Sequence, residues 1–120
     1  MKSIYSEITF KSCLTESEAE GFPVSERTEP ALTIYNIVTS LEGHLMIRTA
    51  IKMAPGVPTA VAFEEVFEKL IGDAAFTNDM KQYTGFLIRR VVERMGGNHV
   101  EKGVSIKRAS RYTRGSIYSL

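Results

Sequence analysis

The fold is decided by residues 78–120, which read NDMKQYTGFLIRRVVERMGGNHVEKGVSIKRASRYTRGSIYSL. The first part has apolar residues at helical spacing, namely Met80, Tyr83, Leu87, Val91 and Met95. After Gly96–Gly97 the period becomes two, and Val100, Val104 and Ile106 share one parity, as in a strand. The stretch therefore predicts a helix that ends at two glycines, followed by a terminal β-hairpin in which Gly103 and Gly115 are bulges or close approaches.

A second helix is predicted immediately upstream, from about Thr59 to Ile71. Phe63, Val66, Phe67 and Leu70 recur at helical spacing opposite Glu64, Glu65 and Glu68. Gly72 is the expected left-handed cap of this helix, and Thr77–Asp79 supply candidate N-caps for the helix that follows.

The N-terminal half is harder to assign. Residues 3–12 alternate between apolar and polar side chains and predict a strand. Residues 13–30 carry five glutamates with Gly21, Pro23 and Pro30, which indicates an acidic connecting arm. Residues 31–53 fit a hairpin that turns at Glu42–Gly43, and the alternative is a helix over residues 29–42.

The predicted fold class is therefore α+β, as one domain over residues 1–120. It has N-terminal antiparallel strands, two central helices and a C-terminal basic β-hairpin. A chain of this length can bury enough surface for a core without metal or disulfide crosslinks. Its 43% apolar and 24% charged residues exclude wholesale disorder.

Charge is divided unevenly along the chain. Residues 1–79 hold six basic and twelve acidic side chains, a net charge of −6, whereas residues 80–120 hold nine basic and two acidic ones, a net charge of +7. The two parts add to the formal +1 of the whole chain. A basic helix plus hairpin over residues 78–120 is consequently the clearest functional signal in the sequence.

Phosphate-backbone binding is the function that this basic region favours. Eight cations and one interleaved tyrosine form the candidate nucleic-acid site: Arg89, Arg90, Arg94, Lys102, Lys107, Arg108, Arg111, Arg114 and Tyr112. Each phosphate that is neutralised releases counterions, and an aromatic ring can stack on an unpaired base. Only Glu93 and Glu101 oppose these cations within the region. We expect a DNA or RNA partner.

A helix followed by a basic-tipped hairpin also resembles the second half of a winged-helix module. The resemblance covers residues 59–120 and is topological. It implies that Arg90 and Arg94 face a groove of the nucleic acid while the hairpin, as the wing, lies on the backbone.

The same charge division has an alternative explanation in protein assembly. The acidic and basic parts can pair within one chain or between neighbouring subunits, because complementary potentials orient protein contacts. The chain is then a small structural or adaptor subunit of a phage, viral or organelle particle, or a homo-oligomer. This hypothesis predicts that several arginines contact the glutamates between Glu16 and Glu29.

Catalytic and metal signatures are missing from the sequence. It has no G-x-S-x-G, P-loop, H-E-x-x-H or EF-hand pattern, so we expect no enzyme, no cofactor and no metal. His44 and His99 are the only histidines. Cys13 is the only cysteine and can form no internal disulfide, which fits a reducing compartment. No apolar run is long enough for a membrane span, so we expect no membrane partner and a location in the cytoplasm or in an intracellular particle.

Overall fold

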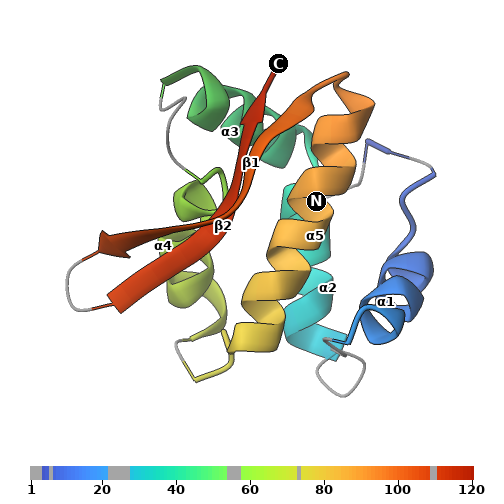
Figure 1. Ribbon diagram of the computed structural model, residues 1–120. Coiled ribbons are helices and arrows are strands. Elements are labelled where there is room, and N and C mark those ends of the chain that lie inside the picture. Colours follow the sequence, from blue (N-terminus) through green and yellow to red (C-terminus); the bar gives the residue numbers. More distant parts are fainter. Residues whose placement is uncertain (1–3, 6, 22–27, 54–57, 73, 109–110) are drawn as a thin grey trace.

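The computed structural model describes residues 4–5, 7–21, 28–53, 58–72, 74–108 and 111–120. Within these ranges, only the backbone is described at residues 28, 62, 65, 78, 101–108 and 111–114. The described elements are α1 (Phe10–Ala19), α2 (Thr28–Val38), α3 (Leu41–Met53), α4 (Val61–Ile71), α5 (Asn78–Arg94), β1 (Asn98–Arg108) and β2 (Arg111–Ser119). Five helices and a two-stranded antiparallel hairpin thus account for the regular structure of the described residues (Figure 1). The α+β class is confirmed, whereas the winged-helix arrangement is not.

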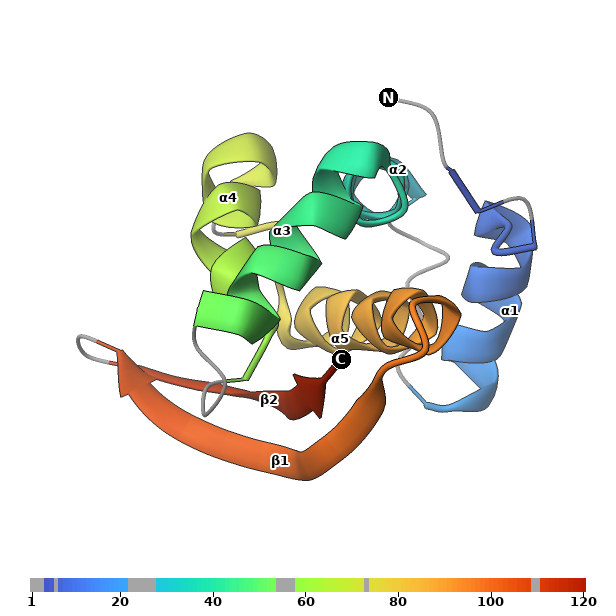
Figure 2. The ribbon, with the colours of Figure 1, turned by 90° about the horizontal axis from the view of Figure 1, so that it is seen from above.

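Helix α5 is the centre of the molecule. Figures 1 and 2 show α1 on one flank of α5 and the hairpin on the other, with α2 packed along it. About half of its described residues are buried, among them Met80, Tyr83, Phe86, Leu87, Ile88, Val91 and Val92. A helix that is apolar around most of its circumference must be covered by neighbours on several sides, which explains its central position.

The two helices predicted in the middle of the chain are confirmed. α4 ends directly before Gly72, whose φ is +86°. α5 ends before Gly96, which has a φ of +79° and donates its N–H to the carbonyl oxygen of Glu93 at 3.2 Å. Gly97 donates to the carbonyl oxygen of Val92 at 2.9 Å, so the last turn keeps its hydrogen bonds as the chain reverses.

The terminal hairpin is also confirmed. Its register is irregular between Glu101 and Val104, around the predicted bulge at Gly103. At Gly115 the backbone of β2 passes close to the residues that precede α4. A Cβ on Gly115 would lie 3.1 Å from the Cβ of Pro58. The Thr59 N–H donates to the carbonyl oxygen of Ser116 at 3.1 Å, and this bond ties the hairpin to the start of α4.

The hairpin predicted over residues 31–53 is wrong, because this segment forms α2 and α3. The buried residues of α2 recur at helical spacing, namely Ala31, Ile34, Tyr35, Ile37 and Val38. In α3, Ile47 and Ile51 are buried, whereas Leu45 and Met53 are 52% and 80% exposed. A strand would have put Leu45 and Ile47 on one face, so the difference in their burial distinguishes the helix. The alternative helix over residues 29–42 agrees with α2 at its start but extends beyond the end of α2 at Val38.

The strand predicted over residues 3–12 is wrong as well. The described residues before Phe10 form no strand, and α1 begins at Phe10 with Thr9 as its N-cap, whose side chain accepts a hydrogen bond from the Ser12 N–H. Burial does not follow the alternating pattern, because Ile4 is 47% exposed whereas Ile8 is 4% exposed. The carbonyl oxygen of Ile8 accepts a 2.5 Å hydrogen bond from the Tyr35 hydroxyl. Part of the predicted acidic arm is therefore helical, and its residues 22–27 lie outside the described residues.

Candidate nucleic-acid interface

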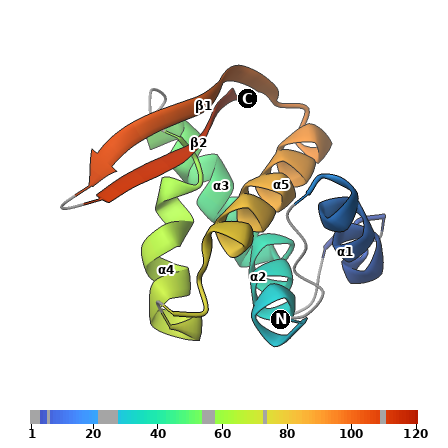
Figure 3. The ribbon, with the colours of Figure 1, turned by 60° about the horizontal axis from the view of Figure 1, so that its bottom comes forward.

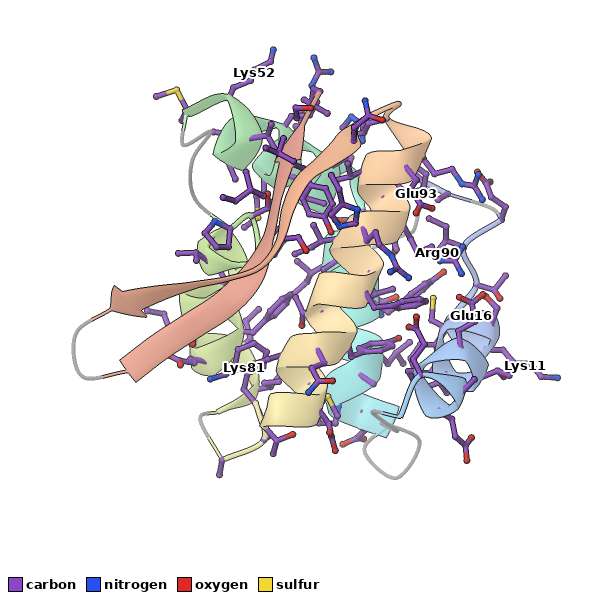
Figure 4. The ribbon with its side chains drawn as sticks, in the orientation of Figure 1. Lys11, Glu16, Lys52, Lys81, Arg90 and Glu93 are labelled. Carbon is purple, nitrogen blue, oxygen red and sulfur yellow. The ribbon has the colours of Figure 1, made fainter. Side chains whose placement is uncertain are left out.

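The three candidate arginines of α5 face α1. Arg90 and Arg94 are one helical turn apart and so share a side of the helix, with Arg89 beside them. Figure 4 shows the side chains of Arg90 and Glu16 lying between α5 and α1. The structure therefore brings these three predicted residues together, on the side of α5 that α1 covers.

Each of the three arginines pairs with a carboxylate from the N-terminal part of the chain. Arg90 pairs with Glu16. An Arg94 Nε to Glu7 Oε1 distance of 3.0 Å and an Arg89 Nη2 to Glu20 Oε1 distance of 3.5 Å define the other two pairs. All six side chains are between 34% and 50% exposed. Water and salt reach these pairs, so each contributes only about 0–1 kcal/mol to stability.

An aromatic ring fixes two of these arginines. The guanidinium carbons of Arg90 and Arg89 lie 5.2 Å and 5.7 Å from the centroid of the Phe86 ring, which is only 6% exposed. A cation over a ring face within about 6 Å is held by the ring quadrupole. The two guanidinium groups are thus oriented by α5 itself, in addition to their carboxylate partners.

The remaining candidate residues lie on the hairpin. The side chains of Lys102, Lys107, Arg108, Arg111, Tyr112 and Arg114 are outside the described residues, so the backbone alone places them. The register sets Arg108 opposite Arg111 and Lys107 opposite Tyr112. Residues 102–120 contain five Lys or Arg and no Asp or Glu. From residue 102 onward, all charged side chains in the sequence of the hairpin are therefore positive.

The base of the hairpin is anchored, and the rest extends away from α1. Ile117 and Tyr118 are 7% and 5% exposed, and the His99 and Tyr118 rings contact each other at a tilt of 36° with centroids 4.6 Å apart. From this base the two strands run past α4 to the edge of the molecule (Figures 1 and 3). The nine predicted residues consequently form two groups on opposite flanks of α5 instead of one continuous face.

The other chemically capable side chains are occupied by structural contacts. His44 Nδ1 shares a hydrogen bond with the Tyr5 hydroxyl, and burial, followed by Arg48, lowers the pKa of His44. Burial raises the pKa of the Cys13 thiol to about 11, so it stays protonated at neutral pH. Glu64, 3% exposed, pairs with Lys81 at 3.3 Å. Over the described part of the chain, no group of three or more His, Cys, Asp or Glu side chains could hold a metal ion.

Sequence reasoning missed two exposed cations on α3. Arg48 and Lys52 lie one turn apart on its solvent-facing side, next to the exposed Leu45. The strand assignment put Leu45 on the face opposite Arg48 and Lys52, whereas a 3.6-residue period applied to residues 41–53 places all three residues on one side. In the described ranges, no helix is both long enough and apolar enough to cross a membrane.

Comparison with known proteins gives one partial similarity. A stretch of 82 residues, 68% of this chain, is 28% identical to nucleolar protein 9 of Pyrenophora teres f. teres (strain 0-1). The chain spans about 11% of the length of that protein. No protein family matches the chain. No solved structure matches it either.

Proposed function

We propose that this chain is a non-enzymatic nucleic-acid-binding protein whose β1–β2 hairpin contacts the phosphate backbone of DNA or RNA. One observation carries the proposal. The hairpin extends from an anchored base past α4, and its sequence from residue 102 onward has five cations and no carboxylate. Acidic residues that pair with arginines are found on the opposite flank, at α1.

The register gives the hairpin its expected binding properties. Arg108 and Arg111 are cross-strand neighbours, and like charges placed opposite each other destabilise a hairpin unless an anion lies between or beside them. A phosphate backbone supplies such anions at regular spacing, and its binding releases condensed counterions. Tyr112, opposite Lys107, adds an aromatic ring on which an unpaired base can stack.

Of the two contacts that the winged-helix resemblance implies, only the contact of the hairpin with the backbone is part of the proposed function. The hairpin takes the position of a wing on the backbone, following directly after α5. Arg90 and Arg94 do not take the groove-facing position that the resemblance implies, because both pair with carboxylates of the N-terminal segment. The similarity to part of a protein named for the nucleolus supports a nucleic-acid-related role in general terms only.

The proposal is tested by a charge reversal in the hairpin. In Arg108→Glu/Arg111→Glu, affinity for labelled single-stranded RNA and duplex DNA of unrelated sequences should fall by about tenfold or more at low salt, since phosphate contacts are lost. The wild-type affinity should fall steeply with rising salt, and the variant should have a log–log slope smaller by about 1 per lost contact. Fluorescence anisotropy across a salt series measures both quantities.

A control variant with the same change in net charge distinguishes the loss of hairpin contacts from a general effect of the protein's charge on binding. Arg48→Glu/Lys52→Glu reverses two exposed cations of α3 and should weaken binding much less. Equal weakening by the two double variants, or wild-type protein that binds neither nucleic acid at low salt, would contradict the proposal. Circular dichroism shows that each variant is folded.

A further inference from the structure

We infer that α1 with its preceding residues is a displaceable acidic cover, and that nucleic-acid phosphates replace its carboxylates on the arginines of α5. The inference rests on the proposed function and adds to it a second, masked contact site. The acidic cover consists of Glu7, Glu16 and Glu20, and the arginine face consists of Arg89, Arg90 and Arg94. These six side chains form three ion pairs.

The chemistry of the arginine face suits phosphate as well as carboxylate. A guanidinium group presents planar, forked donors that bind either anion in the same way. The guanidinium groups of Arg89 and Arg90 also lie 5.7 Å and 5.2 Å from the ring centroid of Phe86, which belongs to α5 and not to the cover. The arginines therefore stay oriented when the carboxylates leave, and the glutamates occupy positions that phosphate oxygens can take.

Within α1 itself few side chains are buried, whereas the segment before it is anchored at Ile8, which is 4% exposed and accepts a hydrogen bond from the Tyr35 hydroxyl. The buried residues of α1 are one small apolar side chain, Cys13, and one hydroxyl, Ser17, whose Oγ donates to the carbonyl oxygen of Leu14 within the helix. Phe10 and Leu14 pack only partly buried against the core. The three ion pairs are half-exposed and are weakened by salt. A polyanion that brings several phosphates to the same arginines can compete with them.

The position of the cover also allows nucleic-acid phosphates to compete with its carboxylates for the arginine face. α1 lies along the flank of α5 opposite the hairpin (Figure 2). A strand of nucleic acid held by the hairpin alone leaves the arginine face untouched, whereas a strand that continues around the molecule meets α1 next. Displacement of α1 would extend the positive surface from the hairpin to α5, which is the site predicted as a whole from the sequence.

The test compares two full-length triple variants that change net charge equally. Glu7→Gln/Glu16→Gln/Glu20→Gln neutralises the cover, and Glu18→Gln/Glu29→Gln/Glu42→Gln neutralises three exposed glutamates. The probe is a labelled single-stranded RNA of about 20 nucleotides, long enough to span several contacts. The cover variant should bind about tenfold tighter than the control variant, because the arginines no longer have carboxylate competitors. Equal affinities of the two variants would overturn the inference.

A second measurement follows the cover directly in the wild-type protein. Hydrogen–deuterium exchange in residues 10–19 should rise when the protein is saturated with the RNA, while exchange in α5 does not rise. Unchanged or slower exchange in residues 10–19 at saturation would overturn the inference and leave the proposed function standing. Wild-type protein that binds no RNA at low salt would overturn the inference, and wild-type protein that binds neither RNA nor duplex DNA would overturn the proposed function as well.

Discussion

His44 connects α3 to the segment that precedes α1. Its Nδ1 hydrogen-bonds to the Tyr5 hydroxyl, and its ring lies 6.1 Å from the Tyr5 ring, centroid to centroid. When the imidazole carries its single proton on Nε2, the tyrosine donates to Nδ1, and protonation of Nδ1 removes that acceptor. Burial and the charge of Arg48 act in the same direction, since both lower the pKa of His44. The folded protein therefore favours the neutral ring.

This preference makes stability depend on pH. The unfolded imidazole takes up a proton near pH 6.5, and the folded one does so only at lower pH. The stabilising contribution is complete above pH 6.5 and is lost as pH falls through the folded-state pKa. Urea unfolding at about pH 7.5 and about pH 5 should show the wild type losing more free energy of unfolding than His44→Gln. A loss of the same size in both proteins would contradict the pH linkage.

Arg90 shows what a sequence can and cannot predict about a single residue. Its position late in a basic helix was evident from residues 78–94, and so was its charge. Its partner, Glu16, is 74 positions earlier in the chain. Sequence spacing predicts contacts within one element, whereas contacts between distant elements depend on packing. The charge excess was therefore predictable, and the assembly hypothesis predicted contacts with glutamates between Glu16 and Glu29, but the sequence did not identify which arginine pairs with which glutamate.

At the scale of elements, the crossing of α2 and α3 depends on Gly43. A Cβ at this position would lie 2.5 Å from the carbonyl oxygen of Val38 and would also collide with that of Ile37. Both atoms are backbone at the end of α2, so the helices would have to move apart. We expect Gly43→Ala to lower the free energy of unfolding by about 1–3 kcal/mol, measured by chemical denaturation.

Gly85→Ala is the matched control for this prediction. Gly85 lies within α5, and its added Cβ would have no neighbouring heavy atom within 4 Å. Alanine is favoured over glycine inside a helix by about 0.5–1 kcal/mol, so this variant should be neutral or more stable. Two variants that change stability alike would show that helix propensity, and not the crossing, decides the effect.

The elements that sequence analysis predicted correctly have clear boundaries. α4 and α5 have long apolar stripes that end at glycines, and the hairpin has a period of two. α2 and α3 were missed because Leu45 and Met53 are apolar but exposed, which imitates an alternating strand. The period of buried residues decides between helix and strand, and burial is known only after the elements pack.

For the whole molecule, the acidic part of the chain (residues 1–79, net −6) and the basic part (residues 80–120, net +7) partly neutralise each other in the folded protein. Three carboxylates from residues 7–20 neutralise three arginines of α5, so part of the opposed charge cancels within one chain. The nine-residue site predicted from the sequence consequently separates into a covered group on α5 and a group on the hairpin. The division of charge predicted that acidic and basic parts can pair, but it did not indicate that the arginines of α5 pair with the N-terminal glutamates while the hairpin lies on the other flank.

The most direct test of hairpin binding is a map of backbone amide chemical shifts. Nitrogen-15-labelled protein is titrated at low salt with single-stranded RNA and, separately, with duplex DNA. We predict that the largest saturable shift changes fall within residues 102–114 for at least one of the two nucleic acids. Saturable binding that leaves the amides of residues 102–114 unchanged would contradict the account.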